Sequence, residues 1–295
     1  MKVEIDQRAG FCAGVARAIH MAEEALAHGE LVSVGPLLHN PQEVERLRRL
    51  GLRVVPQEEI EGADLEGLGA RRVLVRSHGI SPALRARLQN ARLDIVDGTC
   101  PIVRRVQELV QSYCAQGYRV VIFGKKDHPE VRGLVGHCPK GAIVVNSVEE
   151  AEQLPVGVPT VLLAQTTASE QTFRQVERAL RGRIPGLEVC NTTCRSVNRR
   201  QEEVAAFARE HQVVIFVGGR ESSNSRQLFA ACQRHNANSH WVEDEKELRG
   251  EWFSQARTVG VTGGASTPRW LLERVALTIE HVACASGHED QIKRR

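Results

Sequence analysis

Three cysteine-bearing segments repeat along the chain and constrain its fold more than any other sequence feature. Cys12, Cys100 and Cys194 are 88 and 94 residues apart. Each follows a short strand-like run and precedes a stretch with apolar residues at helical spacing. The strand-like runs cover residues 3–6, 93–97 and 187–189, and the helical stretches cover residues 15–27, 102–114 and 197–208. The pattern therefore predicts three copies of one structural unit.

Two further strands follow in each unit, and each ends in a polar group. The first strands cover residues 31–34, 120–123 and 213–217, and the second strands cover residues 73–75, 161–163 and 259–261. The polar groups after the first strands contain His39, His128 and Ser222, which lie 27, 28 and 28 residues after the cysteines. Those after the second strands contain His78, Thr166 and Ser266, at offsets of 66, 66 and 72 residues. Three matching registers support a true repeat.

Strands that alternate with helices specify βαβ units with right-handed crossovers and parallel sheets. We therefore predict an α/β protein with three small, mainly parallel α/β domains related by a pseudo-threefold axis. The predicted ranges are 1–98, 99–192 and 193–284, followed by a polar tail over 285–295. Ligands of such sheets bind beyond the carboxyl ends of the strands, where all the polar groups lie. Helix capping is the alternative role for any one of them taken singly.

Composition and charge exclude several classes of protein. Hydrophobic residues at 42% and charged residues at 25% are typical of a globular protein with a substantial core. A net charge of +3 and an aromatic content of 4% argue against a nucleic-acid partner. No apolar run approaches the about 18 to 20 residues needed to span a membrane. The eight cysteines are scattered in a chain too large to need disulfides, which favours a cytoplasmic location.

The three repeated cysteines are candidate metal ligands. Each opens a helix, where the helix dipole favours the thiolate. Structural zinc fits less well, because it prefers four ligands from close pairs such as C-x-x-C, and Cys190 and Cys194 are four apart. An iron–sulfur cubane held by three thiolates would keep one iron open as a Lewis acid and electron source. The C-x-x-x-C-x-x-C loop of radical enzymes is absent. Spacing alone does not decide between a cluster and another role.

Nine motifs in order along nearly the whole chain resemble the LytB family, the reductases of the non-mevalonate isoprenoid pathway that act on 4-hydroxy-3-methylbut-2-enyl diphosphate. They are Gly10-Phe11-Cys12-Ala13-Gly14-Val15 with Arg17-Ala18, Gly35-Pro36-Leu37-Leu38-His39-Asn40-Pro41, Ser77-His78-Gly79, Asp97-Gly98-Thr99-Cys100-Pro101, Asp127-His128-Pro129-Glu130-Val131 with Gly133, Gln165-Thr166-Thr167, Thr193-Cys194 with Asn198-Arg199-Arg200-Gln201, Ser222-Ser223-Asn224-Ser225, and Thr262-Gly263-Gly264-Ala265-Ser266. Two departures, Arg195-Ser196-Val197 after the third cysteine and Gly263 where alanine is common, touch no ligand.

The resemblance implies the cofactor, the reaction and the partners. Cys12, Cys100 and Cys194 would hold one central [4Fe-4S] cluster whose open fourth iron binds the substrate's allylic hydroxyl. Two electrons and two protons would remove this oxygen as water and give isopentenyl and dimethylallyl diphosphates. The family's electron donor is a ferredoxin or flavodoxin. The family binds the substrate through His39, His78, His128, Thr166, Ser222, Ser223, Asn224 and Ser266.

The same resemblance makes Glu130 the proton donor. Loss of hydroxide needs a nearby acid, and Thr166, with Thr167 as a second choice, would help Glu130 reach the substrate. Enclosure would raise the pKa of this glutamate and keep a proton available near neutrality. The alternative is an exposed glutamate at the start of a helix, where the dipole favours an acid.

Two other functions remain open on the sequence. One is an iron–sulfur redox sensor without turnover, and the other is a cluster-dependent hydro-lyase that needs no reductant. Four other cysteines lie in helical or loop stretches outside the repeat, so we assign them no chemistry: Cys114, Cys138, Cys232 and Cys284.

Overall fold

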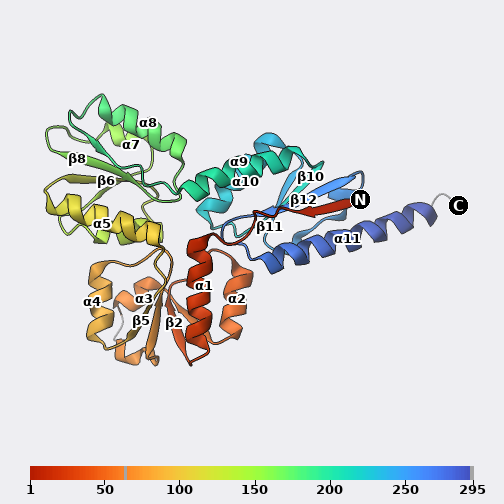
Figure 1. The fold of residues 1–295 in the computed structure, drawn as a ribbon, viewed down its shortest axis with the longest axis horizontal. Helices are drawn as coiled ribbons and strands as arrows, with labels where there is room; N and C mark the ends of the chain where they lie inside the picture. The colour runs from red at the N-terminus through yellow and green to blue at the C-terminus, as the bar shows by residue number, and fades with distance from the viewer. Residues whose placement is uncertain (63–64, 293–295) are drawn as a thin grey trace. The chain divides into compact units, whose positions relative to one another are not determined.

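The chain is described by a computed structural model over residues 1–62 and 65–292 (Figure 1). Its strands form three four-stranded sheets in which every pairing is parallel. The three sheets share one topology. In each sheet, the strand that leads to a cysteine lies at one edge, and the strand that comes first in the unit after its cysteine lies next to the opposite edge. This confirms the predicted α/β class and its three mainly parallel sheets.

The first sheet has the strand order β3-β2-β4-β5. Its strands are β2 (Leu31–Val34), β3 (Leu52–Val55), β4 (Arg72–Val75) and β5 (Asp94–Asp97). The helices of this part of the chain are α1 (Ala13–Leu26), α2 (Pro41–Arg49), α3 (Gln57–Gly62), the 3-10 helix η1 (Leu65–Leu68) and α4 (Pro82–Asn90). All four residues of β2 are buried, as expected for a parallel strand covered on both faces.

The second sheet has the equivalent order β7-β6-β8-β9. Its strands are β6 (Arg119–Phe123), β7 (Ile143–Val145), β8 (Thr160–Ala164) and β9 (Glu188–Val189). Its helices are α5 (Pro101–Ala115), α6 (Pro129–Gly136), α7 (Val148–Glu152) and α8 (Glu170–Arg181). The apolar residues of β6 and β8 point to both faces and enter two separate core clusters, one of them shared with α5 and α6.

The third sheet has the order β11-β10-β12-β1. Its strands are β10 (Val213–Val217), β11 (Ser239–Val242), β12 (Thr258–Gly263) and β1 (Lys2–Ile5). The helices are α9 (Arg195–Arg209), α10 (Ser223–His235), α11 (Arg269–Ile292) and two 3-10 helices, η2 (Glu245–Glu247) and η3 (Gly250–Phe253). Residues 271–279 of α11 pack on one face of β10, β12 and β1.

The pairing of β1 corrects the predicted first domain. Residues 3–6 fall in the predicted range 1–98, but β1 pairs with β12, with Lys2 opposite Thr258 and Ile5 opposite Val261. Each sheet is thus completed by the strand that leads into the next unit's cysteine. Apolar periodicity identifies a strand but not its partner. The other boundaries, at 99, 193 and 285, stay predictions.

The described residues fall into two compact units. The first contains residues 1–15, 38–46 and 196–295 and holds the third sheet. The second contains residues 16–37 and 47–195 and holds the other two sheets. Each unit has its own apolar core, so each holds its functional side chains on a packed scaffold.

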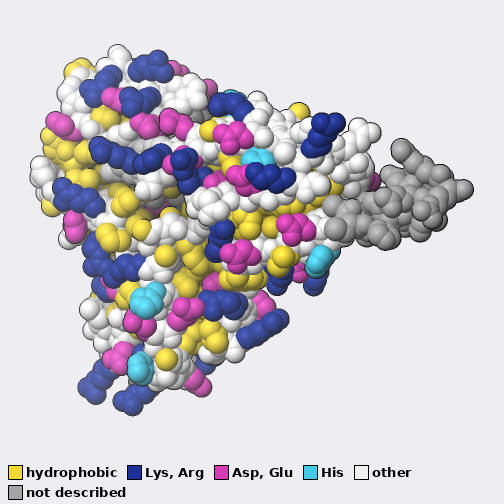
Figure 2. Space-filling model, turned by 45° about the vertical axis from the view of Figure 1, so that its right-hand side comes forward, with side chains coloured by type: hydrophobic (Ala, Val, Ile, Leu, Met, Phe, Trp, Pro, Cys, Tyr) yellow, Lys and Arg dark blue, Asp and Glu magenta, His cyan; other side chains and the backbone are white. Residues whose placement is uncertain are grey.

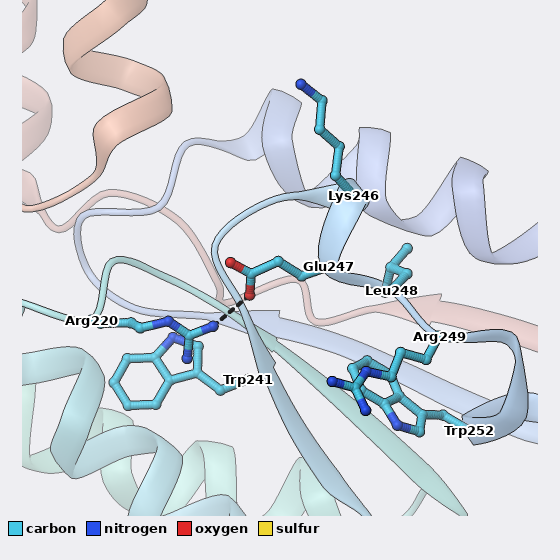
Figure 3. Close-up of a pocket in the computed structure, with 7 residues that line it drawn as sticks. All are labelled: Arg220, Trp241, Lys246, Glu247, Leu248, Arg249 and Trp252. Atoms are coloured by element: carbon cyan, nitrogen blue, oxygen red, sulfur yellow. Dashed lines mark hydrogen bonds and ion pairs between the residues drawn. The ribbon is translucent and has the colours of Figure 1, made fainter.

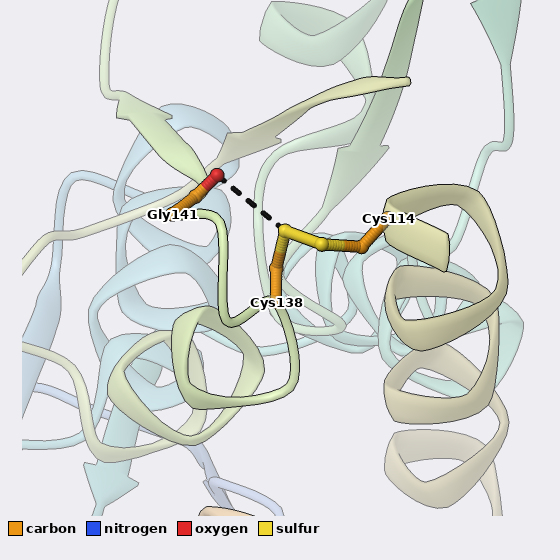
Figure 4. The surroundings of a disulfide bond; sticks show 3 residues. All are labelled: Cys114, Cys138 and Gly141. Atoms are coloured by element: carbon orange, nitrogen blue, oxygen red, sulfur yellow. Dashed lines mark hydrogen bonds between the residues drawn. A yellow bond between two sulfur atoms is a disulfide. The ribbon is translucent and has the colours of Figure 1, made fainter. Parts of the chain in front are cut away.

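One expectation about the cysteines is wrong, and the expectation of a polar tail over 285–295 stays a prediction. Helix α11 runs to Ile292, so residues 285–292 are helical, and 293–295 lie outside the described residues. Cys114 and Cys138 form a disulfide with a Cα–Cα distance of 5.5 Å (Figure 4). These cysteines lie 24 residues apart, and the packing of α5 against α6 brings them together. That packing is a tertiary contact, which spacing could not show.

The helices and the surface charges add two observations. Within the described part of the chain, every helix is too short or too polar to cross a lipid bilayer. On the face shown in Figure 2, Lys and Arg side chains lie among Asp and Glu side chains.

The disulfide should stabilise the chain measurably. Replacing both partners, Cys114→Ala with Cys138→Ala, should lower the free energy of unfolding by about 3 kcal/mol, because the unfolded chain regains the freedom of a 24-residue loop. Urea unfolding with and without a thiol reductant measures this. The reductant should destabilise the natural chain and leave the double variant unchanged. An equal response of both proteins to the reductant would contradict the prediction.

Candidate active site

The second unit buries a carboxyl group against a threonine. Glu130 lies in the first turn of α6 and is 1% exposed. The Thr166 backbone N–H donates to its Oε1 at 2.6 Å, and the Thr166 hydroxyl donates to its Oε2 at 2.8 Å. Both oxygens are therefore held by one residue of the loop that follows β8. Thr167 instead accepts a hydrogen bond from Gln165 Nε2 at 2.8 Å, so the structure places Thr166 on the glutamate.

Burial sets the proton affinity of Glu130. Removal from water raises the pKa of this carboxyl to about 7, although the two hydrogen bonds from Thr166 act in the opposite direction. Desolvation outweighs them because, in the part of the chain that the structure describes, no cation stabilises the charge of this carboxyl. The side chain therefore exchanges a proton near neutrality, as an acid catalyst requires.

A histidine pair stands beside this carboxyl. His128 is the N-cap of α6, and its Nδ1 accepts the Glu130 backbone N–H at 3.2 Å. Pro129 follows at the first helical position, where its missing N–H costs nothing. Because Nδ1 is an acceptor, the proton of the neutral ring lies on Nε2. The His78 ring lies edge to face with the His128 ring at a centroid distance of 5.1 Å. The predicted residues His78, His128, Glu130 and Thr166 are thus brought to one place.

All three repeated cysteines are held by the same backbone contact. The Cys100 N–H donates to the Ser77 carbonyl at 3.0 Å, and the Cys194 N–H donates to the Thr166 carbonyl at 2.8 Å. In the first unit, the Cys12 N–H donates to the Ala265 carbonyl at 3.1 Å. Each acceptor lies in the loop after the strand next to the cysteine's own strand. The three thiols lie outside any disulfide and are partly exposed, and thiolates are suitable metal ligands.

The first unit gathers polar groups at the start of α10. Ser222 caps the helix by accepting the Ser225 N–H at 3.1 Å, and Ser223 and Asn224 are buried in its first turn. Asn224 Oδ1 accepts the Ala265 N–H at 2.8 Å. Three side-chain groups here are buried with no hydrogen-bond partner among the described residues: Asn224 Nδ2, Ser225 Oγ and Ser266 Oγ. Buried polar groups of this kind normally bind something, so this end of the sheet is suited to a polar ligand.

Close backbone contact places the predicted His39 in the same unit. A Cβ on Gly219 would lie 2.0 Å from the His39 carbonyl oxygen, so only glycine fits between β10 and the residue 38–46 segment. A cavity of about 230 Å³ in this unit is lined by Cys12, Asn224 and Ala265, together with Arg8, Phe11 and Arg199. Cys12, a predicted cluster ligand, and Asn224, a predicted substrate-binding residue, therefore line the same cavity.

A second cavity lies at the ends of β10 and β11 and contains none of the predicted site residues (Figure 3). The Arg220 guanidinium lies over the Trp241 ring at 5.9 Å and pairs with Glu247 at 2.5 Å. The Arg249 guanidinium lies over the Trp252 ring at 5.8 Å. Each of these two arginines is therefore already paired with an aromatic ring of the cavity wall.

The predicted site residues are therefore divided between the two units. Cys12, His39, Ser222, Ser223, Asn224 and Ser266 lie in the first, and His78, Cys100, His128, Glu130, Thr166 and Cys194 lie in the second. The sequence analysis missed Ser225, whose hydroxyl is fully buried without a hydrogen-bond partner in the described part of the chain. Its position beside Asn224 within the motif was the available signal.

Fold and site together define a class of protein: a three-sheet α/β protein in which one edge strand of each sheet leads to a cysteine outside any disulfide, with a buried acid and polar groups at the strand ends. The LytB protein family matches residues 3–280, and the chain belongs to this family. This confirms the resemblance that the sequence motifs indicate.

Relatives of the chain match it over nearly its whole length. It is 39% identical over 281 residues to a protein of Geobacter sulfurreducens named 4-hydroxy-3-methylbut-2-enyl diphosphate reductase, with 95% of this chain and 97% of the relative covered. A protein of Aquifex aeolicus with the same name is 38% identical over 283 residues, covering 94% of this chain and 96% of that one.

Two solved structures share the fold. One is described as (E)-4-hydroxy-3-methyl-but-2-enyl diphosphate reductase, the terminal enzyme of the non-mevalonate pathway, and matches with a TM-score of 0.70 and 37% identity over 95% of this chain and 100% of its own. The other, the E-1-hydroxy-2-methyl-but-2-enyl-4-diphosphate reductase from Plasmodium falciparum, matches with a TM-score of 0.81 and 25% identity over 92% of this chain and 85% of its own.

Glu130 should titrate near neutrality. Its pKa of about 7 lies above its ordinary value of 4.5, so the folded chain binds this proton more tightly than the unfolded chain. The resulting stabilisation is complete below pH 4.5 and is lost as the pH rises through about 7. Infrared difference spectra of the carboxyl band should show a transition near pH 7 that Glu130→Gln removes. A band that titrates near 4.5 would contradict the burial argument.

Proposed function

We propose that this chain reduces (E)-4-hydroxy-3-methylbut-2-enyl diphosphate to isopentenyl and dimethylallyl diphosphates, the last step of the non-mevalonate isoprenoid pathway. The observation that carries this proposal is the buried Glu130, because reductive loss of a hydroxyl needs an acid that keeps its proton near neutrality. The names of the relatives support the substrate.

We propose that Cys12, Cys100 and Cys194 hold one [4Fe-4S] cluster. The three partly exposed thiols lie outside any disulfide and follow equivalent strands, which fits such a group, and three thiolates would leave one iron for the substrate oxygen. When bound, the cluster would supply the two electrons and a Lewis acid. The disulfide pairs other cysteines and removes none of these ligands.

The first unit supplies neutral donors for the diphosphate. Asn224 Nδ2 and Ser266 Oγ are buried and unused, so they can donate to phosphate oxygens without losing an existing hydrogen bond. The start of α10 adds the backbone N–H groups and positive dipole end of a 13-residue helix. We propose that His39, Ser222 and Ser223 of this unit, and His78 and His128 of the second unit, complete the set.

The second unit supplies the proton. Glu130 carries it in its protonated form, and the Thr166 hydroxyl is both the hydrogen-bond partner of Glu130 and a group able to pass a hydrogen bond on to the substrate. The Thr166 N–H fixes the other carboxyl oxygen, so the acid has one orientation. His128 is fixed by its cap bond, which leaves Nε2 as its donor.

We further propose that electrons come from an external ferredoxin or flavodoxin and that the enzyme works in the cytoplasm. Net reduction requires a one-electron donor, and the chain's own titratable groups supply protons but no electrons. A reducing compartment keeps the partly exposed ligand thiols from oxidising, whereas the Cys114–Cys138 disulfide is buried and shielded from cellular reductants.

Anaerobic turnover with and without a one-electron reductant tests the function. The cluster-containing chain should form both five-carbon diphosphates only when the reductant is present. Water loss without reductant would indicate a hydro-lyase instead. About four bound irons without any product would indicate a redox sensor.

Removing the acid should stop the reaction but not cluster binding. Glu130→Gln keeps the shape and can still accept one hydrogen bond, but it has no proton to give. We expect turnover to fall by about 10² to 10⁴-fold, the usual contribution of a general acid, with an unchanged visible spectrum. Glu108→Gln, at an exposed position on α5, is the matched control and should keep full turnover. Normal turnover of Glu130→Gln would remove the proposed role.

Cysteine substitution separates ligands from packing residues. Cys100→Ser should reduce iron content well below four per chain, because the hydroxyl is a poor iron ligand at neutral pH. Cys232→Ala should leave iron content unchanged, since Cys232 is fully buried in an apolar cluster and burial raises its thiol pKa to about 12. Iron analysis after anaerobic reconstitution measures both. Loss of iron in the Cys232 variant would overturn the ligand assignment.

A further inference from the structure

Each cysteine loop begins with the same hydrogen-bonded turn. Asp6, Asp97 and Asn191 lie at the ends of β1, β5 and β9, before Cys12, Cys100 and Cys194. In each case Oδ1 accepts a hydrogen bond from the backbone N–H of the residue two positions later in the chain, at 3.0, 3.0 and 3.1 Å. This is an Asx turn, in which a side chain replaces a backbone acceptor and fixes the chain direction.

Two of the turns are closed by a second bond. The Thr99 hydroxyl donates to Asp97 Oδ1 at 2.5 Å, and the Thr193 hydroxyl donates to Asn191 Oδ1 at 2.7 Å. Both threonines are buried and directly precede a cysteine. The cysteine N–H is then bonded to the neighbouring loop. The backbone is thus held at each cysteine and at the turn that precedes it.

The outer terminal atom of each side chain meets a different partner. Asp97 Oδ2 accepts from Arg85 at 2.6 Å and Arg104 at 2.9 Å. Burial opposes the charge of Asp97, but the bonds from Thr99 and Arg85 outweigh it and lower the carboxyl pKa to about 2. In the first unit, Asp6 Oδ2 accepts from Arg200 and from the Thr262 hydroxyl.

The third repeat reverses this polarity. Asn191 Nδ2 donates to Glu170 Oε1 at 3.3 Å, so an amide faces a carboxylate where the other two repeats place a carboxylate facing arginine. Glu170 is itself held by Arg174. The inner atom, Oδ1, is an acceptor in all three repeats, whereas the outer atom is matched to its local partner.

We propose that Asp6, Asp97 and Asn191 are positioning residues that preorganise the cluster-binding cysteines through Oδ1, while the outer atom selects aspartate or asparagine at each site. This rests on the proposed cluster. Each of these side chains then has two functions. Its Oδ1 holds the turn in all three loops, and its outer atom, charged in aspartate and neutral in asparagine, pairs only with a local partner. Preorganised ligands hold a metal longer, because binding orders less of the chain.

The third repeat provides the sharpest test. Asn191→Ala removes the turn, and Asn191→Asp keeps Oδ1 but places a second carboxylate against Glu170. Adding Glu170→Gln to Asn191→Asp restores a donor–acceptor pair. The readout is the rate of iron loss to a chelator after anaerobic reconstitution. We expect loss about tenfold faster for Asn191→Ala and Asn191→Asp, in line with one or two hydrogen bonds or a like-charge pair, and a near-natural rate for the double variant.

A turn outside the cysteine loops controls for general stability. Asn236 Oδ1 accepts the Asn238 N–H at 2.9 Å, and its Nδ2 donates to the Ala208 and His211 carbonyls. Asn236→Ala should lower the unfolding midpoint at least as much as Asn191→Ala, yet leave iron loss unchanged. A merely structural role for Asn191 would make iron loss follow the unfolding midpoint in both variants and would overturn the proposal.

The outcomes also separate this inference from the proposed function. Iron loss that is equal in the natural chain and Asn191→Ala, or a double variant no better than Asn191→Asp, overturns the positioning role alone. A natural chain that binds no iron overturns the proposed cluster and this inference together. Asp97→Asn is the reciprocal exchange, and it should hasten iron loss less than Asp97→Ala because Oδ1 is kept.

Discussion

The structure depends on the parallel pairing of the edge strands β1, β5 and β9. Each completes a sheet and carries the chain to the carboxyl edge, where the next cysteine meets the loop of the neighbouring strand. The cysteine N–H then bonds to that loop's carbonyl, at 2.8 to 3.1 Å in all three repeats. The thiols that we propose as ligands and the polar loops are therefore positioned by the same backbone hydrogen bonds between strands.

The sequence predicted the repeated part of this arrangement and missed what depends on contacts. Periodicity and matched offsets located the strands, the cysteines and the loops at 78, 166 and 266, because these are local or repeated signals. They could not assign β1 to the third sheet, since strand partners are chosen by packing. The disulfide between Cys114 and Cys138 escaped for the same reason. The burial of Glu130 was expected from the family, and the structure supplies its cause in Thr166 and the surrounding core.

Both units place few charged groups at the proposed site, for different electrostatic reasons. The diphosphate-binding groups proposed in the first unit are neutral donors, so Asn224 and Ser266 can lie buried without the desolvation cost of an arginine. In the second unit the proposed proton donor must be able to lose a proton, and among the described residues no cation acts on the buried Glu130. An arginine in contact would lower its pKa and leave it ionised near neutrality, as arginines help to do for Asp97.

The disulfide connects these functions within the second unit. Helix α5 begins next to Cys100, and helix α6 begins next to His128 and carries Glu130 in its first turn. Their other ends are joined by Cys114 and Cys138 (Figure 4). Because a helix transmits displacement along its axis, the covalent link at one end restricts how far the two starts can separate at the other. Cys100, the proposed ligand, and Glu130, the proposed proton donor, are thus linked by one disulfide as well as by the sheet.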